Sequence, residues 1–154
     1  MNILSIGNSF SQDAQRYLHR IAKSAGVELN TYNLCIGGCS LEQHHRNMLG
    51  DNKAYWLEMN GETIGFRVSL KEALLNRRWD IITVQQVSHL AHDYDTFNPY
   101  LSELVAYIRK FCPKSKIALH QTWAYEKGSE RLAQLGSDDY RKMVWDIKRI
   151  GFYA

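Results

Sequence analysis

The sequence has 154 residues, of which 45% are hydrophobic and 23% are charged, and its formal net charge is +3. This composition is typical of a globular domain with a hydrophobic core, and it excludes collagen, coiled coils and disordered chains. The basic residues are spread along the chain and no apolar run of about 18 residues occurs, so we expect neither nucleic-acid binding nor a membrane span. We expect residues 1–154 to form a single domain, cytoplasmic as given, or exported if a signal peptide has been removed.

Hydrophobic periodicity predicts strands that alternate with helices. We expect strands at residues 2–6, 27–34, 81–84 and 116–119. One helix is expected after the first strand, up to a stop at Gly26, with further helices near residues 41–49, 70–75 and 97–108. A last helix should begin at Ser137 and stop at Gly151. This order predicts a mainly parallel sheet covered on both faces.

The segment 54–67 interrupts this alternation. Its apolar and aromatic residues flank Asn60-Gly61, a two-residue signal for a type I′ turn. We therefore expect an inserted β-hairpin, either a lid or a plain insertion. The three cysteines, Cys35, Cys39 and Cys112, form no zinc pattern, and we expect reduced, mostly buried thiols.

Polar loops follow the four expected strands: Gly-Asn-Ser-Phe-Ser from residue 7, Gly-Gly-Cys-Ser from 37, Gln-Gln-Val-Ser-His from 85 and His-Gln-Thr-Trp from 120. Open α/β sheets bind ligands at the carboxyl ends of their strands, so these loops should form one rim. Ser9 lies where a strand passes into a helix, a place whose free N–H groups favour developing negative charge. The alternative is that Ser9 is only a helix N-cap, with Gln12 completing a capping box.

The segments ILSIGNSFSQDA, IGGCSLEQH, WDIITVQQVS and LHQTWAYEKGS resemble the SGNH (GDSL-type) hydrolase superfamily, and in particular its DUF4886-like branch. The resemblance implies a flavodoxin-like three-layer α/β/α fold, with four of the usual five parallel strands in this chain. It also implies a serine nucleophile and no cofactor, as in the esterases, lipases and carbohydrate deacetylases of the superfamily.

By position, the resemblance makes Ser9 the nucleophile and its own N–H one oxyanion donor. Gly38, with Gly37 as the alternate, matches the glycine of the second motif, although the pair also suits an ordinary tight turn. The third motif commonly carries an asparagine, for which we expect Gln86, or Gln85 after a shift of one residue, to substitute. Candidate substrate-binding residues are Asn8, Ser88 and Trp123; Trp123, with Tyr125, could form a sugar-stacking wall or belong to the core.

The superfamily takes its catalytic base from an Asp-x-x-His motif near the C-terminus, and this sequence contains no Asp-x-x-His. We therefore expect a chain truncated before that block, without the fifth strand. A serine hydroxyl needs an adjacent base to react at neutral pH. His120 is the substitute base that the sequence offers, and a structural histidine is the alternative.

The first hypothesis is thus a serine esterase domain that acts on esters of small or carbohydrate substrates. The alternative is a binding module that keeps the pocket but lacks the base. We expect no metal, because neither His44-His45 nor His89-x-x-His92 is completed by ligands at suitable spacing. The strand at residues 116–119 should form an open sheet edge, which predicts self-association of the chain.

Overall fold

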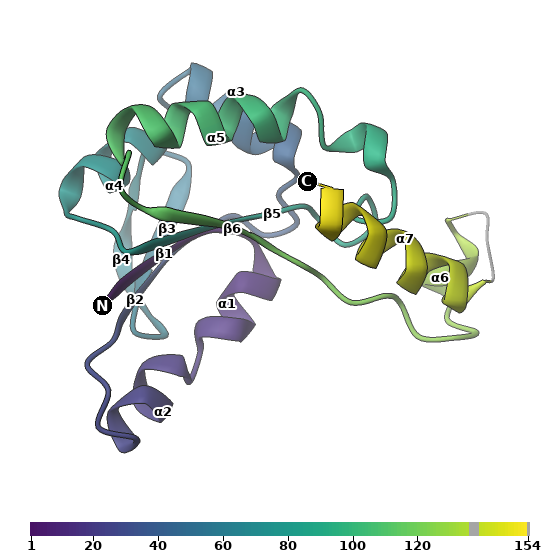
Figure 1. Cartoon of the computed structure of the whole chain (residues 1–154), viewed down its shortest axis with the longest axis horizontal. Helices are drawn as coiled ribbons and strands as arrows, with labels where there is room; N and C mark the ends of the chain where they lie inside the picture. Colours follow the sequence, from purple (N-terminus) through teal and green to yellow (C-terminus); the bar gives the residue numbers. More distant parts are fainter. Residues whose placement is uncertain (136–138, 154) are drawn as a thin grey trace.

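The computed structural model describes residues 1–135 and 139–153 (Figure 1). Its centre is a six-stranded sheet in the order β4-β3-β2-β1-β5-β6. Four strands run parallel: β1 (Asn2–Gly7), β2 (Asn30–Cys35), β5 (Ile81–Gln85) and β6 (Lys116–His120). The hairpin of β3 (Tyr55–Met59) and β4 (Glu62–Val68) joins antiparallel to β2.

Helices cover both faces of this sheet (Figure 1). One face carries α1 (Ser9–Gln15) and α2 (Leu18–Ser24). The other carries α3 (Leu41–Leu49), α4 (Leu70–Asn76) and α5 (Tyr100–Phe111), and a 3-10 turn, Tyr94–Thr96, precedes α5. Beyond the end of β6 lie the short α6 (Glu130–Ala133) and the longer α7 (Tyr140–Tyr153). The three-layer α/β/α fold and the mainly parallel sheet are confirmed.

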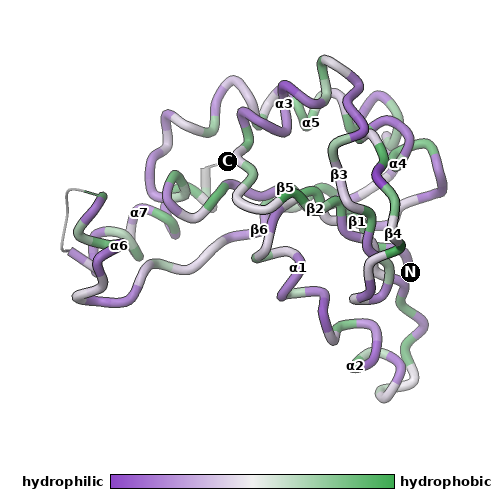
Figure 2. Tube along the Cα trace, turned by 180° about the vertical axis from the view of Figure 1, so that it is seen from behind, coloured by the Kyte–Doolittle hydropathy of each residue, from purple (hydrophilic) through white to green (hydrophobic). Residues whose placement is uncertain are grey.

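The two faces of the sheet differ in chemistry. The face under α3, α4 and α5 holds the hydrophobic core, which includes Leu4, Ile6, Leu34, Ile82 and Leu104, and β5 is among the most hydrophobic stretches of the trace (Figure 2). The face under α1 is polar at its centre. There the Thr83 hydroxyl donates to the Ser5 hydroxyl at 2.9 Å, and the amide of Gln15 also reaches Ser5. Because these groups bond to one another, their burial leaves few polar atoms unpaired.

The strand register brings the four polar loops to one edge. Gly7 at the end of β1 lies opposite Cys35 at the end of β2, and Gln85 at the end of β5 lies opposite His120 at the end of β6. The loops that follow these four residues therefore start at the same level, at the carboxyl ends of parallel strands. This is the rim where α/β sheets bind ligands.

The expected hairpin is confirmed, and it extends the sheet beyond β2 instead of forming a separate lid. Asn60 and Gly61 have positive φ angles of 53° and 87°, as a type I′ turn requires. The turn packs so closely on the chain between α1 and α2 that a Cβ at Gly61 would collide with the carbonyl oxygen of Arg16. A glycine is therefore required there by both backbone conformation and space.

Two expectations for the helices and one for a strand need correction. The single helix expected after β1 is two helices, and its predicted inner residues Tyr17 and Ile21 are 57% and 62% exposed, because the chain breaks at Arg16, where the hairpin turn contacts it. Gly151 does not stop the last helix, which continues to Tyr153. Ser137 lies outside the described residues, and β2 begins at Asn30 instead of Val27.

The strand β6 lies at the edge of the sheet, as the sequence predicts, while self-association through it stays a prediction. The cysteines are free and buried, as expected. In the described part of the chain, no helix is both long enough and apolar enough to cross a membrane.

Candidate active site

Ser9 lies exposed at the start of α1, directly after the buried end of β1. The N-cap of α1 is Asn8, whose side chain accepts a hydrogen bond from the Phe10 N–H at 3.1 Å. The interpretation of Ser9 as the N-cap is therefore wrong, and Gln12 reaches Glu58 instead of closing a capping box. Within the described chain, the Ser9 hydroxyl has no hydrogen-bond partner. The Ser9 hydroxyl is therefore unbonded, on a turn whose N-cap is Asn8.

Asn8 ties three of the four loops together. It is 1% exposed, and its amide nitrogen donates to the Cys39 carbonyl oxygen of the second loop at 3.1 Å. Its amide oxygen accepts from the Gln85 amide at 2.7 Å in addition to the Phe10 N–H. These bonds occupy a side chain that the sequence analysis placed at the substrate, so the geometry gives Asn8 a positioning role.

The amide nitrogens of both glutamines of the third loop already donate hydrogen bonds within the protein. The Gln86 nitrogen donates to the carbonyl and hydroxyl oxygens of Thr96 at 3.0 and 3.1 Å, while its oxygen accepts from the backbone N–H groups of Leu41 and Val87. Gln86 thus links the third loop to α3 and to Thr96, and its expected role as an oxyanion donor stays a prediction. Gln85, the alternate, is fully buried and donates to Asn8.

The second loop exposes Gly37 and Gly38. Gly38 has a φ of +65°, a backbone conformation that favours glycine. Space is not the constraint, because a Cβ at Gly37 or Gly38 would meet no atom within 4 Å. The Gly38 N–H donates no hydrogen bond in the part of the chain that the structure describes. A free N–H on a loop joined to Asn8 through Cys39 suits the second oxyanion donor.

A buried cluster supports this loop from below. The Cys39 thiol lies 3.5 Å from His44 Nδ1, which lies 3.1 Å from the Tyr55 hydroxyl. Burial lowers the pKa of His44 to about 4 and raises the pKa of Cys39 to about 12. Both groups are therefore neutral near pH 7, and they serve the fold as a hydrogen-bonded core.

The fourth loop completes the rim with aromatic side chains. The Trp123 ring is 62% exposed and contacts the Phe10 ring, next to Ser9, with centroids 4.4 Å apart. The Ser88 hydroxyl pairs with the Tyr125 hydroxyl at 2.9 Å and so links the third and fourth loops. Trp123 thus contacts the residue that follows Ser9, and its expected contact with a substrate stays a prediction, whereas Ser88 is buried and bonded to Tyr125.

His120 ends β6 opposite Gln85. Neighbouring residues of paired strands share a face, and Gln85 reaches Asn8 at α1, so His120 lies on the α1 side of the sheet. Burial lowers the pKa of His120, which leaves a neutral imidazole able to accept a proton. No hydrogen bond joins His120 to Ser9 in this structure.

A polar network beneath Ser9 was missed by the sequence analysis. The Ser11 hydroxyl is 2.8 Å from both the Asn8 carbonyl oxygen and Asn33 Oδ1, and the Asn33 amide donates to Glu58 at 2.7 Å. Its sequence signal is weak: one carboxylate, Glu58, within the otherwise apolar strand YWLEM, and the second of the two asparagines, Asn33, within NTYNLC. The partners come from separate elements, so periodicity could not have joined them.

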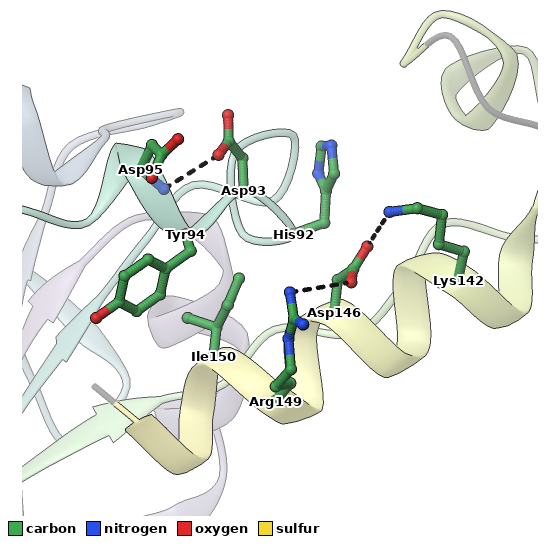
Figure 3. Close-up of a pocket in the computed structure, with 8 residues that line it drawn as sticks. All are labelled: His92, Asp93, Tyr94, Asp95, Lys142, Asp146, Arg149 and Ile150. Atoms are coloured by element: carbon green, nitrogen blue, oxygen red, sulfur yellow. Dashed lines mark hydrogen bonds and ion pairs between the residues drawn. The ribbon is translucent and has the colours of Figure 1, made fainter.

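A cleft of about 840 Å³ lies between residues 92–95, which precede α5, and α7 (Figure 3). It is lined by His92, Asp93, Tyr94, Asp95, Lys142, Asp146, Arg149 and Ile150. Its buried carboxylate, Asp146, pairs with Lys142 at 2.5 Å and with Arg149 at 3.8 Å. No residue of the first or second loop lines this cleft, so it is separate from the surface around Ser9.

Among the residues that the structure describes, no three His, Cys, Asp or Glu side chains are arranged to hold a metal.

Comparison with known proteins identifies the family of this chain. The family described as "Domain of unknown function (DUF4886)" matches residues 2–149. A DUF4886 family protein from Bacteroides uniformis has a similar structure, with a TM-score of 0.91 and 35% identity; the match covers 99% of this chain and 62% of that one. The chain thus spans less than two thirds of that protein's length. No curated protein matches it.

More distant structures share the fold. A putative SGNH hydrolase from Slackia heliotrinireducens is 22% identical with a TM-score of 0.65, over 97% of this chain and 71% of that one. The acetyl xylan esterase AlAXEase is 13% identical with a TM-score of 0.59, over 99% and 73%. The fold is thus that of SGNH hydrolases, and the chain belongs to the DUF4886 family.

Proposed function

We propose that this domain is a serine esterase of the SGNH type, acting on acyl esters of small or carbohydrate substrates. The observation that carries the proposal is the exposed, unbonded hydroxyl of Ser9 on a turn that Asn8 fixes to the second and third loops. Structures that share the fold include an acetyl xylan esterase and a family two carbohydrate esterase.

In this mechanism the Ser9 oxygen attacks the ester carbonyl carbon, and the serine proton passes to His120. The first-turn N–H of Ser9 and the N–H of Gly38 hold the oxyanion, since neither has a partner among the residues that the structure describes. The alcohol then leaves with the proton held by His120, and water releases the acyl group from Ser9. Trp123 and Phe10 supply an apolar wall for the ester or its sugar ring.

Hydrolysis of p-nitrophenyl acetate and of acetylated xylo-oligosaccharides tests this proposal. Ser9→Ala is expected to reduce turnover to background and His120→Ala to reduce it strongly, while Ser102→Ala, an exposed serine of α5, should leave it unchanged. Turnover by the Ser9→Ala protein equal to wild type would refute the assignment of the nucleophile.

A second candidate, a ligand-binding module without turnover, is favoured by one observation: no base from residues 1–135 or 139–153 is hydrogen-bonded to Ser9. It predicts that the wild-type chain binds acetylated oligosaccharides in calorimetry, that Trp123→Ala weakens this binding, and that no acetate is released. Acetate release that depends on Ser9 would exclude this candidate.

A further inference from the structure

Glu58 is a buried carboxylate on the inserted hairpin, and the mechanism above does not use it. It is 7% exposed, and its two oxygens accept hydrogen bonds from the Asn33 amide, at 2.7 Å, and from the Gln12 amide. No Lys, Arg or His side chain pairs with it in the described structure. Burying a carboxylate without a cation is costly, so its hydrogen bonds must offset that cost.

Both bonds lead to the turn that carries Ser9. Gln12 closes this turn, because its backbone N–H donates to the Asn8 carbonyl oxygen at 3.1 Å. Asn33 accepts from the Ser11 hydroxyl, which also contacts the Asn8 carbonyl oxygen at 2.8 Å. The hairpin thus holds the first turn of α1 by two separate routes that start at one carboxylate.

The far end of α1 meets the same hairpin, where Gly61 packs against the carbonyl of Arg16. The hairpin's attachment to the hydrophobic core is separate, since Tyr55 and Leu57 belong to the core on the opposite face of the sheet. Glu58 therefore contributes contacts to α1 that the hairpin does not need for its own packing.

We propose that Glu58 is a positioning residue, through which the inserted hairpin sets the orientation of the Ser9 hydroxyl. This inference rests on the proposed function, and Glu58 itself touches neither Ser9 nor a substrate. A carboxylate accepts at both oxygens, whereas a glutamine would present its NH₂ group to one of the two amides, which would have to turn its own oxygen toward position 58.

The test compares Glu58→Gln with Glu62→Gln, the same substitution at an exposed site of the same hairpin. Glu62 forms a surface ion pair with Arg20, and loss of such a pair has little effect. The probe is a fluorophosphonate, and the measured quantities are its rate of reaction with Ser9 and the hydrogen exchange of the Gln12 amide. We expect Glu58→Gln to slow labelling about tenfold or more and to speed this exchange, with unchanged circular dichroism, whereas Glu62→Gln stays within about twofold of wild type.

The double variant Gln12→Glu/Glu58→Gln exchanges the two groups and restores a donor for every acceptor. It should recover most of the labelling rate, which a loss of stability alone would not predict. Gln12→Ala is a milder variant, because Gln12 is exposed and the Glu58–Asn33 bond remains. It should slow labelling severalfold even if Glu58→Gln does not fold.

Wild-type labelling rates and wild-type Gln12 exchange in the folded Glu58→Gln and Gln12→Ala proteins would overturn the inference. If Ser9 of the wild-type chain does not react at all, the proposed function fails, while the exchange of the Gln12 amide still decides whether Glu58 holds the turn.

Discussion

Replacement of Asn8 by alanine tests how strongly one side chain holds the rim together. The change removes the N-cap of α1, and it leaves the Gln85 amide and the Cys39 carbonyl oxygen without their partner in a buried site. Loss of an N-cap costs about 1 kcal/mol, and each buried group left unpaired costs about 1–3 kcal/mol. The free energy of unfolding should therefore fall by roughly 3 kcal/mol or more.

The matched control is Ser40→Ala, which removes the N-cap of α3. That loss should cost only about 1 kcal/mol, since the Ser40 side chain accepts a single bond from Gln43. Urea denaturation followed by circular dichroism measures both values at 25 °C. Equal destabilisation by the two substitutions would show that the bonds of Asn8 to the second and third loops contribute nothing to stability.

Three further predictions concern the glycine, histidine and aromatic residues of the site. Gly7→Ala should lower the unfolding free energy by about 1–3 kcal/mol in urea denaturation, because the new Cβ would lie 2.5 Å from the Ser11 hydroxyl and 2.6 Å from Gln85 Oε1. Gly37→Ala, where the new Cβ would meet open space, should have almost no effect. Burial lowers the pKa of His44 in the folded protein to about 4. As the pH falls below about 6.5, the unfolded chain therefore binds a proton at His44 that the folded chain does not bind. The free energy of unfolding should decline by about 1.4 kcal/mol per pH unit down to about pH 4. His44→Phe should remove that part of the slope, and an unchanged slope would contradict the assignment. Trp123→Ala should raise KM for aryl or sugar esters severalfold without changing the unfolding midpoint. The control Trp145→Ala, at a similarly exposed site on α7, should change neither quantity. Equal KM values for the two variants would argue against the aromatic wall.

Much of the fold could be predicted from the sequence because its signals are local. Runs such as Ile81 to Val84 mark buried strands, and Asn60-Gly61 marks the hairpin turn through the φ angles that it allows. The break between α1 and α2 could not be predicted, because it coincides with a contact from the hairpin turn, which lies far away in the sequence. Apolar spacing alone predicts one helix that continues across Arg16 and buries Ile21, whereas Ile21 is exposed in the structure.

The candidate site was predictable in its location but not in its hydrogen bonds. The register of parallel strands follows from their order, so the convergence of the four loops could be expected. Which amide faces an oxyanion depends on side-chain partners such as Thr96 for Gln86, and residue spacing does not contain that information. For the same reason Asn8 was expected at the substrate and is found between the loops.

Covalent labelling of the wild-type chain with a fluorophosphonate, followed by peptide mapping in a mass spectrometer, shows whether Ser9 is a reactive nucleophile. We expect one phosphonyl adduct, on Ser9, which is lost in Ser9→Ala and retained in Ser102→Ala. A folded wild-type protein that carries no adduct on Ser9, or that is labelled equally after Ser9→Ala, would contradict this expectation.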